Sequence, residues 1–216
     1  MKVAIAGGHG KIAMLLAQLL NQGGHQAVGL IRNPDHSGDL AAVGADVVVC
    51  DLEAADADQI AAAVDGADAV VFAAGAGPGS GAERKRSMDL GGAVKLIEAA
   101  KAEGVDRYLM VSSMGAGDPP PEGEGDVFGE YLRAKAGADE ALSASGLDYT
   151  IVRPGMLSDD PPAGKVTVGE NVERGEISRA DVAAVLLACL ETEGTSGKAF
   201  EVVTGETPID EALAAL

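Results

Sequence analysis

Aromatic residues are scarce in this chain, which has three tyrosines, three phenylalanines and no tryptophan among its 216 residues. Aliphatic side chains must therefore build most of the core, and an apolar share of 47% is enough to cover a sheet on both faces. The 30 glycines indicate many tight turns and close backbone approaches. A chain of this length suits one α/β domain.

Basic residues are also few, 16 against 34 acidic ones, which gives a formal net charge of −18. A field of that sign repels nucleic acids and anionic membrane surfaces, so we expect neither as a partner. The same excess of acid favours solubility, and it is compatible with a salty habitat as well as with an ordinary acidic protein.

Cysteine is limited to Cys50 and Cys189, which lie far apart in apolar runs. This is a poor disulfide framework and predicts buried thiols in a reducing compartment. No signal peptide is recognisable after Met1, and the longest later apolar run, residues 183–190, is too short to span a bilayer. We expect a cytoplasmic protein. No His, Cys and carboxylate cluster has ligand spacing, so no metal site is predicted.

Apolar runs and segments of helical period alternate from end to end. Strands are predicted at residues 3–6, 27–31, 46–50, 69–73, 107–112, 149–152, 166–168 and 200–203. Helices are predicted at 10–22, 56–64, 83–103, 126–145 and 179–190, with a last one after Pro208. This alternation predicts a parallel sheet with helices on both faces. The longest irregular segments, 115–125 and 153–164, are of the length that usually serves function.

A glycine-rich turn joins the first strand to the first helix. It reads G-x-x-G-x-x-A from Gly7 through Gly10 to Ala13 and overlaps G-x-G-x-x-A from Gly8. Gly7 and Gly8 permit the tight turn, Gly10 lets the backbone approach a pyrophosphate, and the helix N-terminus attracts phosphate. The turn residues expected to contact a dinucleotide are Gly7, Gly8, His9, Gly10, Lys11 and Ile12. The alternative is a β–α turn that holds no ligand.

The end of the second strand indicates which dinucleotide is bound. An NAD site usually has a carboxylate there to bond the ribose 2′-hydroxyl, whereas this chain has Arg32 and Asn33. A guanidinium can hold a 2′-phosphate by paired hydrogen bonds, which favours NADP(H) over NAD(H). The alternative for Arg32 is a solvated surface side chain. The later strand ends expected to frame the cofactor are Asp51, Leu52, Ala73, Ala74 and Gly75.

A Y-x-x-x-K pair, Tyr131 and Lys135, lies on the helix predicted after the fifth strand. A spacing of four places both side chains on one helix face, where the lysine ammonium would favour proton release by the phenol. The phenol could then exchange a proton with a carbonyl or alcohol. Ser112 and Ser113 end the fifth strand, so a hydroxyl could face the same crevice.

These motifs resemble the short-chain dehydrogenase/reductase superfamily, and most closely its small atypical, epimerase-like or NmrA-like NAD(P)H-binding members. The resemblance covers nearly the whole length and is strongest in S-G-L-D-Y-T-I-V-R-P-G, residues 145–155. It implies a single Rossmann-type, doubly wound α/β domain over 1–216, with strand order 3-2-1-4-5-6-7 and a small substrate-side region at about 153–178. It also implies catalytic roles for Ser113, Tyr131 and Lys135, nicotinamide ribose contacts from Lys135, and Pro154, Gly155 and Met156 beside the nicotinamide.

Two departures from the superfamily bear on activity. Its additional active-site asparagine corresponds to Asp89 here, which puts the proton-relay part of the mechanism in doubt. The chain is also short at its C-terminus and lacks the substrate domain of extended sugar-nucleotide epimerases.

Three functions follow as hypotheses. The first is an NADP(H)-dependent oxidoreductase acting on a small carbonyl, quinone or related substrate. The second is a non-catalytic NADP(H)-binding redox sensor that signals to a protein partner. The third is an NADP-dependent epimerase. A small-molecule substrate is the expected partner, and a homodimer is compatible with the sequence.

Overall fold

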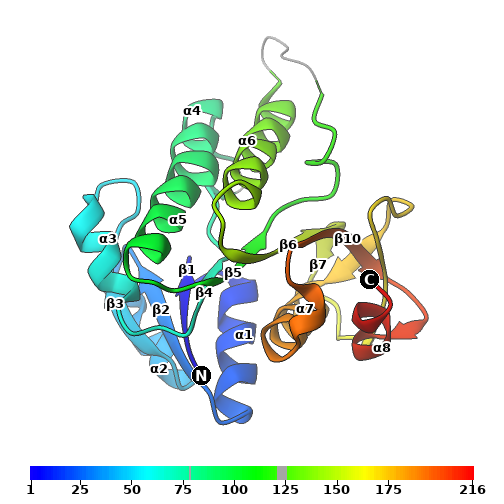
Figure 1. Cartoon of the computed structure of the whole chain (residues 1–216), viewed down its shortest axis with the longest axis horizontal. Helices are drawn as coiled ribbons and strands as arrows, with labels where there is room; N and C mark the ends of the chain where they lie inside the picture. Colours follow the sequence, from blue (N-terminus) through cyan, green and yellow to red (C-terminus); the bar gives the residue numbers. More distant parts are fainter. Residues whose placement is uncertain (78, 121–125) are drawn as a thin grey trace.

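The computed structural model describes residues 1–77, 79–120 and 126–216 and has one central sheet covered by helices on both faces (Figure 1). The strands of this sheet are β1 (Lys2–Ala6), β2 (Gln26–Ile31), β3 (Asp46–Val49), β4 (Ala69–Phe72), β5 (Arg107–Val111), β6 (Asp148–Pro154), β8 (Lys165–Gly169), β10 (Lys198–Thr204) and β11 (Thr207–Pro208). Their spatial order is β11-β8-β10-β6-β5-β4-β1-β2-β3. A separate parallel pair consists of β7 (Met156–Ser158) and β9 (Glu176–Ser178).

The predicted fold class is confirmed, because the order 3-2-1-4-5-6 runs through parallel pairs, with Ala4 opposite Val28 and Val111 opposite Val152. The seventh place is taken by β10, which is parallel to β6. The sheet is not parallel throughout, since β8, the strand expected at 166–168, pairs antiparallel with β10. The physical reason is that the chain passes from β6 to β8 without a crossover helix, so β8 runs back in the direction opposite to β6 and to β10, which is parallel to β6.

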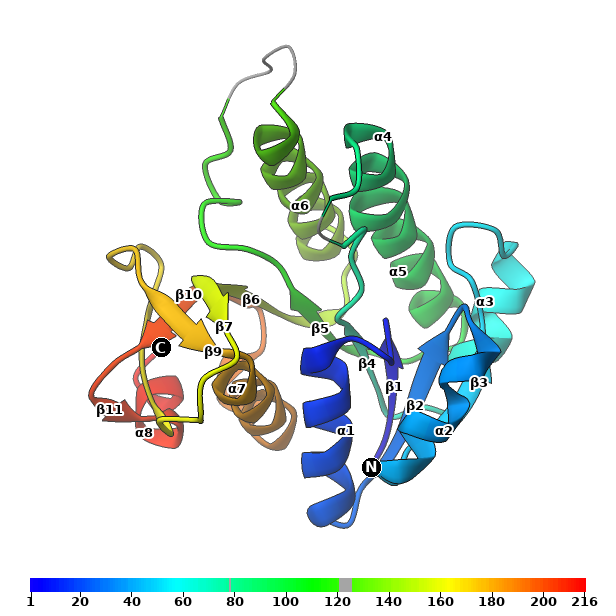
Figure 2. The ribbon, with the colours of Figure 1, turned by 180° about the vertical axis from the view of Figure 1, so that it is seen from behind.

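Helices α1 (Lys11–Gln22) and α7 (Arg179–Glu191) cover one face of the sheet, with α2 (Ser37–Ala42) and α8 (Ile209–Ala214) at its margins. The other face carries α3 (Ala57–Val64), α5 (Ala93–Ala102) and α6 (Val127–Ser143). Figure 2 shows the α1 and α7 side. Alternate residues of β1 serve the two cores: Val3 and Ile5 pack on the α1 side, and Ala4 and Ala6 pack on the α5 side.

The helix predicted at 83–103 is continuous but not uniform. It starts as α4 (Ala82–Arg84), widens into the π-helix η2 (Lys85–Gly92) and continues as α5. Asp89 in η2 is fully buried and accepts a hydrogen bond from the backbone N–H of Ala76 at 3.1 Å. Single-turn π segments of this kind are frequent at functional sites. Figure 1 shows α4 and the start of α6 at the same end of the molecule.

Short elements account for most of what the sequence analysis missed. They are α2, β7, β9, β11 and the 3₁₀ turns η1 (Pro34–His36) and η3 (Glu193–Thr195). Of the loop expected at 115–125, residues 121–125 lie outside the described part of the chain.

Helix α6 is held against the sheet by a buried polar cluster as well as by apolar packing. Its Asp139 is 4% exposed and accepts hydrogen bonds at 2.9 Å from the Ser112 hydroxyl and from Nε of Arg153. Burial raises the pKa of Asp139, and the Ser112 hydrogen bond and the Arg153 charge offset only part of that effect. The cluster therefore ties α6 to the end of β5 and to β6.

Tyr108 lies at the centre of the sheet in β5 and is fully buried, and its hydroxyl has no hydrogen-bond partner among the described residues. Burial raises its pKa well above the usual value. An unsatisfied buried hydroxyl costs on the order of 1 kcal/mol or more.

We expect Tyr108→Phe to increase the free energy of unfolding by about 1 kcal/mol, measured by urea denaturation. The half-buried Tyr149, changed to Phe, is the control, and a less stable Tyr108→Phe protein would show that the hydroxyl is satisfied.

Asp139 gives a pH dependence of stability. Its folded pKa is above the unfolded value of about 3.9, so the folded state binds more protons between the two values. The contribution of this residue to stability therefore falls as pH rises from about 4 through the folded pKa. Asp139→Asn removes this titration.

We expect the free energy of unfolding of the wild type, minus that of Asp139→Asn, to decrease as pH rises over about 4.5 to 7.5 in urea denaturation. Asp58→Asn, at an exposed position of α3, should give a flat difference. A difference that stays constant or grows with pH for Asp139→Asn would contradict the assignment.

Candidate functional site

The glycine turn between β1 and α1 is built by close backbone contacts. Gly7 has a φ of +75°, and the N–H of Gly10 donates to its carbonyl oxygen at 2.7 Å. A Cβ on Gly8 would lie 2.7 Å from Cα of Gly29 in β2, and a Cβ on Gly7 would lie 2.6 Å from Cα of Ala74. Side chains are therefore excluded here, and the first turn of α1 opens directly onto the sheet edge.

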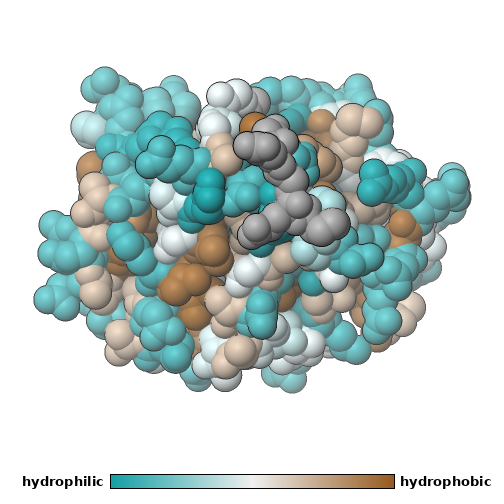
Figure 3. All heavy atoms as spheres, turned by 90° about the horizontal axis from the view of Figure 1, so that it is seen from above, coloured by the Kyte–Doolittle hydropathy of each residue, from teal (hydrophilic) through white to brown (hydrophobic). Residues whose placement is uncertain are grey.

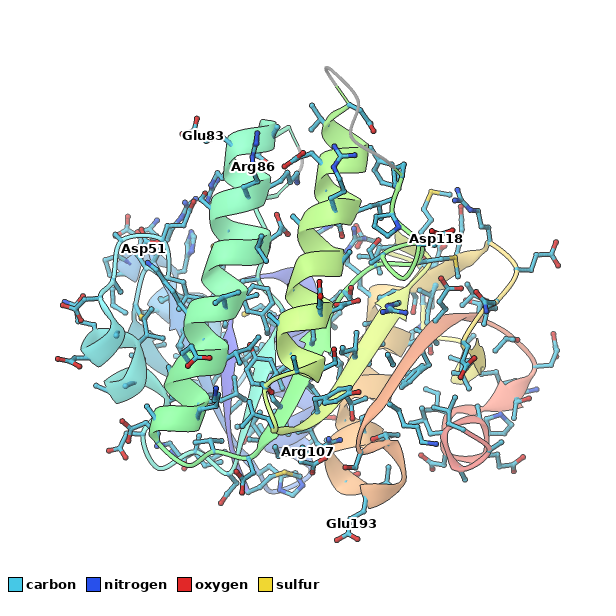
Figure 4. The ribbon with its side chains drawn as sticks, turned by 45° about the horizontal axis from the view of Figure 1, so that its top comes forward. Asp51, Glu83, Arg86, Arg107, Asp118 and Glu193 are labelled. Carbon is cyan, nitrogen blue, oxygen red and sulfur yellow. The ribbon has the colours of Figure 1, made fainter. Side chains whose placement is uncertain are left out.

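A pocket of about 550 Å³ lies over this turn at the carboxyl ends of the strands. It is lined by Gly7, Gly8, His9, Gly10, Leu30, Ile31, Arg32, His36, Cys50, Asp51, Leu52, Glu53, Ala73, Ala74, Gly75, Ala76, Gly77, Arg84 and Met88. The pocket thus gathers ends of β1, β2, β3 and β4, which is where doubly wound sheets bind nucleotides. We name it the turn pocket. Figure 4 shows Asp51 on its β3 side.

Two arginines at the turn pocket share one carboxylate. Glu53 lies 3.2 Å from the Arg84 guanidinium and 3.9 Å from that of Arg32, and it accepts a hydrogen bond from the Ser87 hydroxyl at 2.6 Å. Hydrogen bonds from Ser87 and Arg84 lower the pKa of Glu53, so it is ionised at neutral pH. The side chain of Arg32 is 57% exposed and free to turn toward a ligand. Nothing in the sequence indicated that Glu53 would meet these arginines, because the three residues come from different elements.

Histidines also line the turn pocket. The rings of His9 and His36 stack with centroids 3.7 Å apart, and Nε2 of His9 lies 2.9 Å from Asp39. His36 follows β2 in η1, and nothing in the sequence placed it beside the glycine turn. Asn33, expected to touch cofactor, uses its side-chain oxygen to cap η1 by accepting from Asp35 N–H.

A second pocket, of about 760 Å³, adjoins the first and shares Ala73, Ala74, Gly75 and Gly77 with it. Its other lining residues are Ile12, Gly79, Ser80, Gly81, Lys85, Asp89, Val111, Ser112, Val127, Phe128, Tyr131, Lys135 and Leu157. We name it the α6 pocket, because α6 supplies its tyrosine and its lysine. A dinucleotide that has its phosphates at the glycine turn can reach from one pocket into the other.

The Tyr131 and Lys135 pair lies at the α6 pocket, but the lysine is engaged elsewhere. Lys135 is 4% exposed, its ammonium donates to the carbonyl oxygen of Val111 at 3.0 Å, and it lies 3.6 Å from Oδ1 of Asp89. The ammonium of Lys85 lies over the Tyr131 ring, 5.1 Å from the ring centroid. Asp89 thus serves as the counter-ion of Lys135, a charge neutralisation that a neutral asparagine at this position would not supply.

The two serines at the end of β5 differ in position. Ser112 lines the α6 pocket, and its hydroxyl donates a hydrogen bond to Asp139. The Ser113 hydroxyl makes a 3.4 Å hydrogen bond to the carbonyl oxygen of Met114, and Ser113 does not line the pocket. The catalytic role predicted for Ser113 remains a prediction, and the geometry favours Ser112 for a hydroxyl that faces a ligand.

The segment after β6 meets the α6 pocket through Leu157. Pro154, Gly155 and Met156, predicted beside the nicotinamide, do not line either pocket, and Met156 is 65% exposed. Of the turn residues, Ile12 lines the α6 pocket, while Lys11 forms an ion pair with Asp159 in the loop after β7. Asp159 also pairs with Arg179, so this loop is tied to the start of α1.

Among the described residues, no group of His, Cys, Asp and Glu side chains is arranged to hold a metal ion. Within the same part of the chain, no helix is long and apolar enough to cross a membrane. The residues do fit a nicotinamide dinucleotide: the glycine cradle excludes side chains where a pyrophosphate would lie, and two pockets that share Ala73, Ala74, Gly75 and Gly77 lie beside it.

A family model and a related bacterial protein match this chain over most of its length. The model of the NAD(P)H-binding family matches residues 7–193. The Bacillus subtilis protein YhfK, by name an uncharacterized sugar epimerase, is 40% identical over 214 residues, which cover 99% of each chain.

Solved structures with the same fold include two similar over nearly their whole length. A Bacillus halodurans protein, provisionally described as an NAD-dependent epimerase/dehydratase, is 42% identical, with a TM-score of 0.92 and 100% of both chains covered. The anaerobilin reductase ChuY of Escherichia coli O157:H7 is 28% identical, with a TM-score of 0.80, covering 95% of this chain and 98% of the other. The chain therefore belongs to the NAD(P)H-binding family of Rossmann-type, oxidoreductase- and epimerase-like proteins.

Proposed function

We propose that the protein is an NADPH-dependent reductase of a conjugated carbonyl compound. The observation that carries this proposal is the α6 pocket, an apolar space with a tyrosine on its wall that adjoins the glycine turn. The relationship to an anaerobilin reductase supports reduction over epimerisation as the reaction class. Bound in the two pockets, the dinucleotide would supply a hydride from its nicotinamide.

The chain's own residues supply position and a proton. Tyr131 lies on the pocket wall, where its phenol would donate a proton to the substrate oxygen as the carbonyl is reduced to the alcohol. The hydride would come from the bound dinucleotide, and the phenolate would take a new proton from solvent. Asp89 and Lys135 fix the floor of the pocket by bonding the backbone at Ala76 and Val111.

We favour NADP(H) as the cofactor because arginine side chains lie at the turn pocket. Arg32 and Arg84 lie on either side of Glu53 in a cluster of two guanidinium groups and one carboxylate, and Asp51 is a second carboxylate on the lining. A 2′-phosphate with its paired oxygens matches the planar donors of a guanidinium. The end of β2 provides no carboxylate for a ribose 2′-hydroxyl.

The non-catalytic sensor is a second candidate, favoured by one specific observation. Lys135 directs its ammonium to Asp89 and to the Val111 carbonyl instead of to the phenol of Tyr131. In a sensor this buried pair would have a structural role only, and cofactor binding alone would be the function.

The cofactor preference is tested by calorimetric titration with NADP⁺ and NAD⁺. We expect NADP⁺ to bind at least tenfold more tightly, equivalent to about 1.4 kcal/mol, and Arg32→Ala to narrow the gap by weakening NADP⁺ selectively. Arg86→Ala, which removes an arginine outside both pockets, is the matched control. Equal affinities in the wild-type protein would refute the preference.

The proton donor is tested by following NADPH oxidation with phenanthrenequinone and a panel of aromatic aldehydes. Tyr131→Phe keeps the ring and removes the phenolic proton, so turnover should fall by roughly 10² to 10⁴ while NADPH affinity stays within about threefold. Tyr149→Phe, remote from both pockets, is the control. Unchanged turnover in Tyr131→Phe would exclude Tyr131 as the acid, and absence of turnover in the wild type across the panel would favour the sensor.

A further inference from the structure

The α6 pocket has walls suited to a flat, apolar ring. Ile12, Val111 and Leu157 contribute aliphatic surface from three separate elements. Phe128 and Tyr131 stand one helical turn apart on α6, with ring centroids 6.0 Å apart and planes tilted by 34°. Phe128 is 62% exposed, so much of its ring is open to contact with a ligand in the pocket. Figure 3 shows that the surface at this end of the molecule mixes apolar and hydrophilic groups.

The charged side chains on the lining of the α6 pocket have a net positive charge, because one lysine remains after a buried ion pair is left out. Asp89 and Lys135 are both buried and neutralise each other at 3.6 Å. The remaining charged side chain on the lining is Lys85. Its ammonium donates to the carbonyl oxygen of Gly77 at 3.1 Å and lies over the Tyr131 ring, and it forms no ion pair with any residue that the structure describes.

The two arginines that flank Lys85 are each paired with a carboxylate. Arg84 binds Glu53 at the turn pocket, and Arg86 lies 3.2 Å from Glu130 on α6. Figure 4 shows Arg86 near the outer end of the helix, close to Glu83. In a chain with more than twice as many acidic as basic residues, 34 against 16, a lysine that borders an apolar pocket and has no carboxylate partner among the described residues is suited to bind an external anion.

We propose, building on the reductase function above, that Lys85 anchors a carboxylate of the substrate. The substrate class is then a planar, conjugated ring ketone that also carries an acid group. The ring lies against the apolar wall beside Phe128 and Tyr131, and the acid replaces the Gly77 carbonyl as the partner of the ammonium. A positively charged ring system of the same shape is disfavoured, because the same ammonium repels it.

The position of Lys85 links recognition to chemistry. Its ammonium is held over the ring of the residue proposed as proton donor, 5.1 Å from the ring centroid. An acid group bound there brings the rest of the substrate into contact with Tyr131 and with the shared wall at Ala74 and Gly75, where the turn pocket begins. Lys85 is therefore a specificity-determining residue, distinct from the buried Lys135.

The test compares three probes of one shape: fluorenone-2-carboxylate, its neutral carboxamide and a trimethylammonium-substituted fluorenone. Each is titrated calorimetrically into the full-length protein saturated with NADP⁺. We expect the carboxylate to bind at least tenfold more tightly than the carboxamide, and the cation to bind most weakly. Raising the salt concentration should weaken binding of the carboxylate alone.

Variants then assign the preference to one side chain. Lys85→Met should remove the difference between carboxylate and carboxamide, and Lys85→Arg should keep most of it. Arg86→Met makes the same change in net charge at the next residue, outside the pocket, and should behave as wild type. Circular dichroism and thermal unfolding establish that each variant is folded, and Lys85→Arg retains the charge if the methionine variant does not fold.

The outcomes separate this inference from the reductase proposal. A carboxylate preference that depends on Lys85, without NADPH oxidation, would support the anchor and count against the reductase. NADPH-dependent reduction of fluorenones with the same KM for acid and amide would overturn the anchor and leave the reductase standing. Failure of the carboxylate to bind more tightly than the carboxamide, including binding of neither probe, overturns the anchor.

Discussion

The contact between Asp89 and Lys135 connects the parts of this molecule that form the site. Asp89 comes from the π-helical segment, Lys135 from α6, and both are buried. Through the Ala76 N–H and the Val111 carbonyl they also bind the ends of β4 and β5. Each charge depends on the other, because a single buried charge without its partner costs several kcal/mol. The pair therefore fixes how far the two helices stand from the sheet edge, and with that the floor of the α6 pocket.

The architecture was predictable because periodicity and glycine position act locally. The alternation of strands and helices and the turn at Gly7 follow from apolar runs, helical spacing and a motif that needs no side chain, whereas the order 3-2-1-4-5-6 was implied by the resemblance to the superfamily. The antiparallel β8 was not predictable in the same way, since its short apolar run carries no information about direction. The π-helical widening around Asp89 also escaped prediction, because Asp89 depends on partners in two other elements.

The site was predictable where strand ends converge and unpredictable where a side chain had a choice of partner. Arg32, Asp51 and Ala74 line the turn pocket as expected. Tyr131 and Lys135 lie on one pocket, but helical spacing could not tell that the lysine would turn to Asp89. Asp139, a further turn along α6, accepts a hydrogen bond from Ser112, which lines the α6 pocket, whereas Ser113 does not line it. Such choices are set by competing hydrogen bonds in three dimensions.

The two lysines at the α6 pocket illustrate how one charge type can serve two purposes. Lys135 is buried beside its counter-ion Asp89, so its charge is neutralised inside the protein and helps to hold the strand ends in place. Among the described residues, the partners of the Lys85 ammonium are a carbonyl and an aromatic face, contacts that an incoming anion can outcompete. In an acidic protein most lysines and arginines find a carboxylate nearby. A lysine at an apolar pocket that has no carboxylate partner among the described residues can still attract an anionic ligand. This difference in pairing, rather than the distance from the Tyr131 ring alone, distinguishes a lysine with a structural role from one that recognises a ligand.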